Sequence, residues 1–220
     1  MISNRNKLNK VLIIYSIILF AVWAAYELLL VPHIKAGVSE QTFRILDSNV
    51  IKPAVWMLPA ILLIRHFNAE VSVPLNEMFG IRRGWKVLLS AFVLITAYLC
   101  FMAWRKFGSI SIHGSIPFSI LIYTFVGFCE EIVFRGWLFN ATVKEERPEP
   151  AYAINAAMFL LIHFPKWIAD GILVKQILSG SALLLLMLSL LLAWSFRKSR
   201  SIIVPAFLHF WWDLLVSLLL

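Results

Sequence analysis

Two adjacent glutamates and an arginine interrupt an otherwise apolar run, Pro117–Asn140, that we expect to cross a membrane. A charge at the centre of a membrane helix costs about 2.5–3.5 kcal/mol on insertion scales, so these side chains must face protein or a water-filled cavity. Glu131 and Arg135 are four residues apart and share a helix face, which lets them pair. Glu130 points about 100° away from Glu131 on an ideal helix and has no partner of opposite charge there. We therefore predict that Glu130 is a general base and that the Glu131–Arg135 pair is structural.

A histidine near the end of another apolar run, Ala151–Phe164, is the second candidate. Asn155, Phe159 and His163 follow one another at four-residue steps, so they lie on one stripe of a helix. Pro165 is expected to end or bend this helix just beyond His163. The alternative role for such a histidine is a hydrogen bond between two helices.

A second histidine lies in the last apolar run, Ile202–Leu220. This helix is expected to begin near Pro205, since proline suits a first helical turn. His209 and Asp213 are four residues apart on one face. The Asp213 carboxylate is therefore expected to accept a hydrogen bond from one imidazole nitrogen and to fix which nitrogen faces the site.

The depths of these residues in their helices predict a common site. At about 1.5 Å per residue, Glu130 and His209 lie roughly 11–15 Å from the cytoplasmic ends of their spans, and His163 about 15–20 Å. Three separate spans would thus bring one glutamate and two histidines to nearly one level. We expect a single site that opens to the cytoplasmic side.

The elements that position these residues are expected to be membrane-spanning helices. Of the 220 residues, 61% are hydrophobic and 15% are charged, whereas a typical soluble domain is about 45–50% apolar and about 25% charged. Backbone groups in hydrocarbon must be paired within their own segment, which selects helices. The chain is predicted to be an all-α polytopic transmembrane helix bundle of about seven spans, with residues 1–220 as a single membrane domain. The seven runs are Lys10–Val31, Ile51–His66, Trp85–Trp104, Pro117–Asn140, Ala151–Phe164, Ser179–Phe196 and Ile202–Leu220. The second and fifth are short, which leaves a re-entrant or tilted arrangement open there.

The lysines and arginines predict the orientation, because cytoplasmic loops carry an excess of them. With a cytoplasmic N-terminus, 12 lie in inner segments and 7 in outer segments, and Arg135 lies in a span. The inner ones are Arg5, Lys7, Lys10, Arg65, Arg82, Arg83, Lys86, Lys144, Arg147, Arg197, Lys198 and Arg200. The outer ones are Lys35, Arg44, Lys52, Arg105, Lys106, Lys166 and Lys175. We therefore predict a multi-pass protein of the cell membrane with its N-terminus in the cytoplasm.

The basic residues do not indicate nucleic acid as a partner, because they separate apolar runs and form no stripe on a soluble domain. Three other classes of intramembrane protease fit poorly. The sequence has no HExxH motif, which a zinc metalloprotease of that kind requires. It also lacks the Gly-x-Ser-Gly of rhomboid-like serine enzymes and the Gly-x-Gly-Asp of aspartyl enzymes.

Taken in order, Glu130-Glu131-xxx-Arg135, Phe159-xxx-His163 and His209-xxx-Asp213 resemble the motif set of the CAAX-protease and bacteriocin-processing (Abi) family of intramembrane proteases. This family is related to the CAAX prenyl endopeptidases. The resemblance covers about residues 117–220, which we expect to form the catalytic core. One position departs from the pattern, because the family often has Asn where this chain has Asp213. The aspartate can still orient His209 or a metal, but it adds a negative charge.

The resemblance implies hydrolysis of a peptide bond within or next to the membrane. Glu130 would activate a water as a general base, and His163 would help to hold that water or a metal. His209 and Asp213 would polarise the scissile carbonyl or stabilise the oxyanion. The supporting residues would be Glu131, Arg135 and Phe159.

The sequence is compatible with a catalytic zinc ion. Glu130, His163 and His209 would supply three ligands and leave one position free, which is the pattern of catalytic zinc. A Glu130 that binds zinc, however, is poorly placed to act as a free base. The sequence leaves both arrangements open.

The expected partners are the lipid bilayer and a membrane-associated or secreted peptide or protein substrate. Two other functions compete with proteolysis. One is a non-catalytic immunity or binding protein that keeps the fold, which the complete set of Glu130, His163 and His209 disfavours. The other is a proton-coupled transporter, which the lack of a visible repeat disfavours.

Overall fold

Every regular element in the computed structural model is a helix across the residues that it describes, 2–81 and 84–220. The predicted all-α membrane bundle is therefore confirmed. Arg82 and Arg83, which we assigned to an inner loop, lie outside the described residues. The α-helices are α1 (Ile2–Ala25), α2 (Val31–Gly37), α3 (Glu40–Ile45), α4 (Leu58–His66), α5 (Leu75–Met78), α6 (Trp85–Phe107), α7 (Ile116–Glu131), α8 (Asn140–Thr142), α9 (Glu149–Leu161), α10 (Phe164–Ala169), α11 (Leu173–Leu178), α12 (Ser181–Ser199) and α13 (Ile203–Leu219). The π-helical segments are η1 (Tyr26–Leu30), η2 (Leu46–Ile51), η3 (Pro53–Met57) and η4 (Ile132–Phe139).

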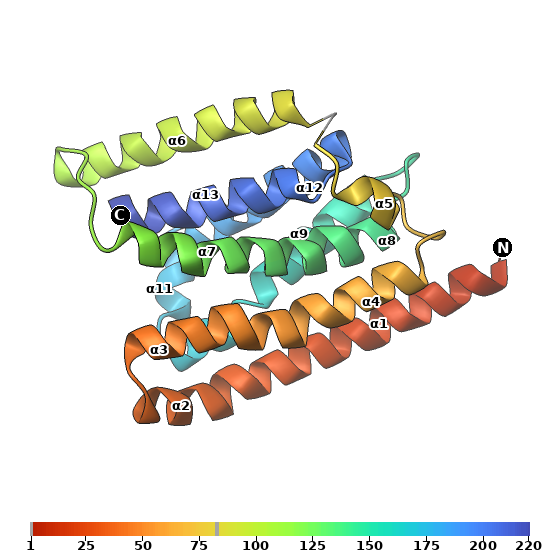
Figure 1. Cartoon of the computed structure of the whole chain (residues 1–220), viewed down its shortest axis with the longest axis horizontal. Coiled ribbons are helices and arrows are strands. Elements are labelled where there is room, and N and C mark those ends of the chain that lie inside the picture. Colours follow the sequence, from red (N-terminus) through yellow and green to blue (C-terminus); the bar gives the residue numbers. More distant parts are fainter. Residues whose placement is uncertain (1, 82–83) are drawn as a thin grey trace.

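The first 66 residues form two long antiparallel rods (Figure 1). One rod runs through α1, η1 and α2, and the other returns through α3, η2, η3 and α4. Ser39 begins the second rod, since its Oγ accepts a hydrogen bond from the backbone N–H of Thr42 at 3.2 Å. The π-helical segments lie inside the rods and change which side chains face the rest of the bundle.

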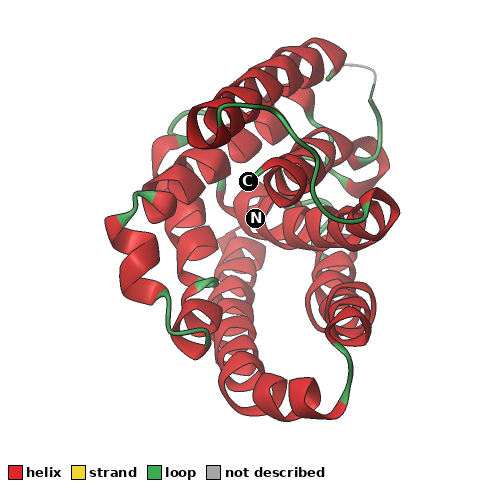
Figure 2. Ribbon diagram, turned by 90° about the vertical axis from the view of Figure 1, so that its left-hand side faces the viewer, coloured by secondary structure: helices red, strands yellow, loops and turns green. Residues whose placement is uncertain are grey.

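The second half of the chain packs around α7 and α13, which lie side by side (Figure 1). Helix α6 covers one flank of α13, while α12 packs against both α9 and α13. Figure 2 looks along the bundle from the end that carries the C-terminus. The candidate residues therefore come from helices that touch one another.

A glycine allows the close crossing of α7 and α13. A Cβ atom at Gly127 would lie 2.9 Å from the carbonyl oxygen of Ala206 and 3.0 Å from the backbone nitrogen of Phe210. Real Cβ atoms essentially never come so close to backbone, so a larger residue here would force the two helices apart. Gly127 lies one turn before Glu131, and the Phe210 backbone that it faces directly follows His209. This close approach brings the two motifs within hydrogen-bonding reach.

Five helices are long and apolar enough to cross a membrane, as judged by length and composition in the described residues. They are Arg5–Gly37, Glu40–His66, Trp85–Phe107, Ile116–Thr142 and Ser181–Ser199. Helix Ile203–Leu219 is also apolar but shorter, and the run predicted at Ala151–Phe164 is divided between α9 and α10. The chain is a multi-pass membrane protein, and the count of seven spans stays a prediction.

The segments that we place on the cytoplasmic side meet at one end of the bundle. Arg197 in the last turn of α12 pairs with Glu145 between α8 and α9 at 3.1 Å, and Arg200 pairs with Glu77 in α5 at 3.0 Å. The N-terminus lies at this same end (Figure 1).

Reporter fusions test the predicted orientation. A reporter fused after Lys10 and one inserted in the 144–150 loop should both report the cytoplasm, because this end carries the excess of basic residues. A third reporter, fused after Leu220, should report the opposite side. Two cytoplasmic signals with an external third would support the orientation, whereas the reverse pattern would show that the bundle is inserted the other way round.

Candidate active site

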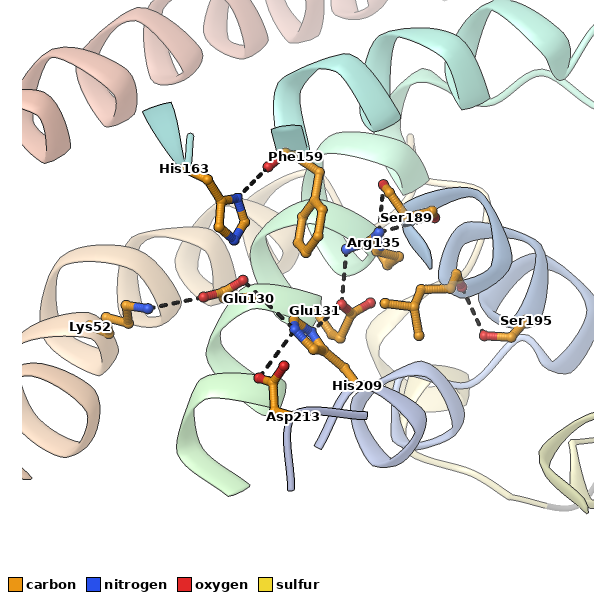
Figure 3. Close-up of polar contacts among 11 residues, drawn as sticks. Lys52, Glu130, Glu131, Arg135, Phe159, His163, Ser189, Ser195, His209 and Asp213 are labelled. Carbon is orange, nitrogen blue, oxygen red and sulfur yellow. Dashed lines mark hydrogen bonds and ion pairs between the residues drawn. The ribbon is translucent and has the colours of Figure 1, made fainter. Parts of the chain in front are cut away.

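Glu130 and Glu131 end helix α7 and face different parts of the protein. Glu130 is 4% exposed and Glu131 is fully buried. The backbone continues directly into the π-helical segment η4, Ile132–Phe139. Such segments are rare and often lie at functional sites. The divergence that we expected from helix geometry is present, and each carboxylate has its own set of partners (Figure 3).

The structure contains the Glu131–Arg135 pair that the four-residue spacing predicts. Nη1 of Arg135 lies 2.9 Å from Oε1 of Glu131, and both side chains are fully buried. Nη2 of Arg135 donates to the hydroxyl and the carbonyl of Ser189 on α12, at 2.7 and 3.0 Å. The guanidinium also lies 4.4 Å from the ring centre of Phe159 on α9. Arg135 therefore connects α7, α9 and α12.

His209 is oriented by Glu131. We had expected Asp213 to orient it. Its Nδ1 lies 2.8 Å from Oε1 of Glu131, and a carboxylate only accepts, so Nδ1 donates. Its Nε2 lies 3.6 Å from Oδ2 of Asp213, beyond ordinary hydrogen-bond length, and 4.0 Å from Oε2 of Glu130. The close α7–α13 crossing brings Glu131 to the ring, which explains the difference. Nε2 is thus turned toward both Glu130 and Asp213.

His163 lies just past the end of α9, in the turn that precedes α10. Of the predicted stripe, Asn155 and Phe159 therefore lie in α9, whereas His163 lies beyond its end. Pro165 belongs to the first turn of α10. Nδ1 of His163 lies 2.7 Å from the carbonyl oxygen of Phe159, and a carbonyl only accepts, so Nδ1 donates. Nε2 is left free, and Figure 3 shows the ring turned toward Glu130.

Phe159 separates the two histidines and packs against both. Its ring centre lies 5.2 Å from that of His163 and 5.7 Å from that of His209. It also packs edge-on against Phe134 at 5.0 Å. This wall, together with Arg135 over its face, fixes the spacing of the two imidazoles and keeps lipid away from the ion pair.

Lys52 is a member of this cluster that the sequence analysis missed. Its Nζ lies 3.0 Å from Oε1 of Glu130. We had assigned Lys52 to an outer segment, next to the predicted start of a span at Ile51. The helix in fact begins at Glu40, so Lys52 lies well inside it. A lysine within an apolar run was the available signal, because such residues face partners or cavities.

A cavity of about 390 Å³ lies against His163. Its walls are mostly apolar and include Tyr98, Leu188, Trp212 and Leu220. These lining residues come from the second halves of α6 and α13 and the first half of α12, which lie away from the N-terminus (Figure 1). We had expected the site to open toward the side that carries the N-terminus. This cavity lies toward the other side and touches His163 but neither Glu130 nor His209, so the side on which the site opens stays a prediction.

The side chains do not form a ready zinc site. No group of three His, Cys, Asp or Glu residues in the described parts of the chain is arranged to hold a metal ion. The Lys52 ammonium already binds one oxygen of Glu130, and an ammonium repels a cation at that carboxylate. The donor set of Glu130, His163 and His209 does not fit zinc in this arrangement.

Residues 112–215 match the family model described as type II CAAX prenyl endopeptidase Rce1-like. The chain contains an Rce1-like domain. This finding agrees with the resemblance to the CAAX-protease and bacteriocin-processing family. All three motifs, from Glu130 to Asp213, lie within the matched residues, and Lys52 lies outside them. No curated protein and no solved structure matches the chain. The matched family model describes CAAX prenyl endopeptidases, so the similarity of residues 112–215 points toward a protease.

Removing the guanidinium of Arg135 is expected to destabilise the protein. Arg135→Ala leaves Glu131 charged and buried, and breaking a buried pair in this way typically costs about 3–5 kcal/mol. Thermal unfolding in detergent should show a much lower melting temperature. The matched control is Arg197→Ala, which removes an exposed pair with Glu145 and should cost about 0–1 kcal/mol. Equal melting temperatures for the two variants would contradict the structural role of the Glu131–Arg135 pair.

Proposed function

We propose that this protein is an intramembrane endopeptidase in which Glu130 activates the attacking water. The observation that carries the proposal is the state of its Oε2 atom. This oxygen is buried and has no hydrogen-bond partner among the described residues, which is also true of Oε2 of Glu131. What distinguishes Oε2 of Glu130 is that it lies 4.0 Å from Nε2 of His209. A buried carboxylate oxygen without a partner is costly. A water or substrate group between Glu130 and the histidines would satisfy it.

The proposed reaction uses residues of the chain only. Glu130 takes a proton from the bound water, and the resulting hydroxide attacks the carbonyl carbon of the scissile peptide bond. His163 accepts a hydrogen bond from the same water through its free Nε2. When the tetrahedral intermediate collapses, the C–N bond breaks and Glu130 returns the proton to the leaving amine.

His209 is placed to stabilise the charge that develops on the carbonyl oxygen. Its Nδ1–H is held by Glu131, so the ring is oriented before substrate binds. In the proposed step Nε2 also carries a proton and donates it in a hydrogen bond to the oxyanion. Asp213, whose Oδ2 is 3.6 Å from Nε2, supports the positive charge of the ring. An asparagine at position 213 would orient the His209 ring without adding a charge.

The cavity beside His163 indicates the kind of substrate. Its mostly apolar walls, with Trp212 and Leu188 among them, suit the side chains of a membrane-inserted segment. Its volume of about 390 Å³ lies in the usual range for ligand pockets. We infer a substrate peptide or membrane protein whose apolar residues lie beside the scissile bond, in contact with the bilayer.

Replacing Glu130 with glutamine tests the general base. Glu130→Gln keeps the size of the side chain and removes the proton acceptor, so cleavage should fall by about 10²–10⁴-fold. His163→Ala and His209→Ala should fall to a similar rate, because groups that act as one unit are not additive. The measurement uses purified protein in liposomes with reporter peptides that carry an apolar membrane segment, and products are identified by mass spectrometry.

His113→Ala is the matched control, since this exposed histidine lies outside the cluster, and it should cleave at the wild-type rate. Near-normal cleavage by folded Glu130→Gln would show that another group is the base. A wild-type protein that binds these peptides without cutting them would favour the immunity or binding function instead.

Chelation tests separately whether the reaction uses zinc. A zinc enzyme should lose its cleavage activity after treatment with a chelator and regain it when Zn²⁺ is added, because the metal would polarise the substrate carbonyl. The same treatment of a reaction that runs through Glu130 and the histidines alone should leave the cleavage rate unchanged. The readout is the rate of peptide cleavage, with zinc content measured in parallel.

A further inference from the structure

The middle of the second rod carries a lysine in an unusual setting. Lys52 lies between the π-helical segments η2 and η3, and its side chain is 14% exposed. A lysine inside an apolar membrane helix is costly, and such residues are rare unless they have a role. Pro53 follows it directly, and π-helical turns flank it on both sides. Within the second rod, the π-helical turns occur only on the two sides of Lys52.

Two tryptophans hold the ammonium of Lys52 in place. Its Nζ lies 5.5 Å from the ring centre of Trp23 and 5.3 Å from that of Trp56. The two indole rings also touch each other at 4.7 Å, edge to face, and both are almost fully buried. Cations are attracted to the faces of aromatic rings, most strongly to tryptophan. The lysine is therefore held from both rods of the first half of the chain.

The carboxylate that Lys52 contacts is Glu130. Nζ donates to Oε1 at 3.0 Å, while Oε2 of Glu130 has no partner in the described residues and faces His209. Asp47 lies earlier on the same rod and accepts a hydrogen bond from Tyr26 at 2.9 Å. Lys52 thus anchors one oxygen of Glu130, and the other oxygen is turned toward the histidines.

We propose that Lys52 is a positioning residue that holds the Glu130 carboxylate in the orientation needed to accept a proton from water. The proposal rests on the proposed proteolytic function and extends the active site into the first half of the chain, outside residues 112–215. Without the ammonium, the Glu130 carboxylate can rotate about its terminal bond and Oε2 loses its fixed direction. A misplacement of about 1 Å can lower a catalytic rate by about 10²-fold.

A purely structural ion pair would differ in two respects. The Glu131–Arg135 pair shows the structural pattern, because Oε1 of Glu131 binds two donors and the arginine also contacts two further residues, Ser189 and Phe159. Glu130 instead binds a single donor on one oxygen. That arrangement fixes the direction of the carboxylate and keeps its second oxygen available.

The test is a cycle of variants at Lys52 and Glu130, with the liposome peptide-cleavage assay and thermal unfolding as readouts. Lys52→Met removes the charge and keeps the length of the side chain. We expect its kcat to fall by about 10²-fold, by the misplacement argument above, with KM changed by less than about twofold. Lys52→Arg keeps the charge and should recover part of this loss, although its fork binds a carboxylate in a different geometry.

The decisive comparison uses the Glu130→Gln background. A residue that acts through Glu130 should have almost no further effect there, so Lys52→Met/Glu130→Gln should cleave within about twofold of Glu130→Gln alone. This double variant buries no charge at either position and should fold even where Lys52→Met does not. Lys35→Met is the matched control, since Lys35 also lies over a ring, 5.0 Å from the centre of Phe43, and it should keep the wild-type kcat.

Three results would overturn the proposal. One is a folded Lys52→Met with wild-type kcat, which would leave only a structural role. Another is an equal loss of rate on adding Lys52→Met in both backgrounds, which would show action independent of Glu130. The third is a Lys52→Arg variant that is as slow as the Glu130→Gln enzyme, which would show that charge at this position is not what matters. Wild-type protein that cleaves none of the peptides would instead overturn the proposed function, and that result is distinguishable because it does not depend on any variant.

Discussion

A single oxygen atom, Oε1 of Glu131, accepts hydrogen bonds from two buried donors on two helices. Arg135 reaches it at 2.9 Å and His209 at 2.8 Å. A bilayer offers no water to replace either bond, so both donors must stay on this oxygen or remain unsatisfied. Arg135 then carries the constraint on to Ser189 in α12 and to Phe159 in α9. The direction of the His209 ring, and with it the position of Nε2 opposite Glu130, depends on this one carboxylate.

Local helix geometry was enough to predict that the two adjacent glutamates have different partners. Neighbouring residues on a helix point about 100° apart, so Glu131 could reach Arg135 one turn later while Glu130 could not. That inference used no contact between helices, and the structure contains the pair. The all-α membrane fold followed equally well from composition, because hydrocarbon allows so few kinds of backbone structure.

Contacts between helices could not be predicted from local helix geometry or from composition. The bond from His209 to Glu131 depends on the close crossing at Gly127, and the bond from Lys52 to Glu130 depends on how the second rod turns against α7. Neither rotation is specified by the spacing of apolar residues, and the π-helical segments shift it further. For the same reason the level of the site was easier to predict than the side of its cavity. Depth follows from residues counted along each helix, whereas an empty volume depends on where helices diverge.

The two buried carboxylates show why chemistry is expected at Glu130 and not at Glu131. The Glu131 side chain is fixed because Arg135 and His209 both donate to the same oxygen. Removing this carboxylate would leave two buried donors without an acceptor in a low-dielectric interior. Glu130 has one anchor, Lys52, and its second oxygen lies 4.0 Å from Nε2 of His209. A carboxylate oxygen that already accepts from two buried donors, as Oε1 of Glu131 does, resists protonation and movement, which suits a support. A carboxylate that is anchored on one side and open on the other combines a fixed direction with an available lone pair, which is what proton transfer from water requires. Because both residues are glutamates, the difference in their expected reactivity comes from their surroundings and not from the residue type.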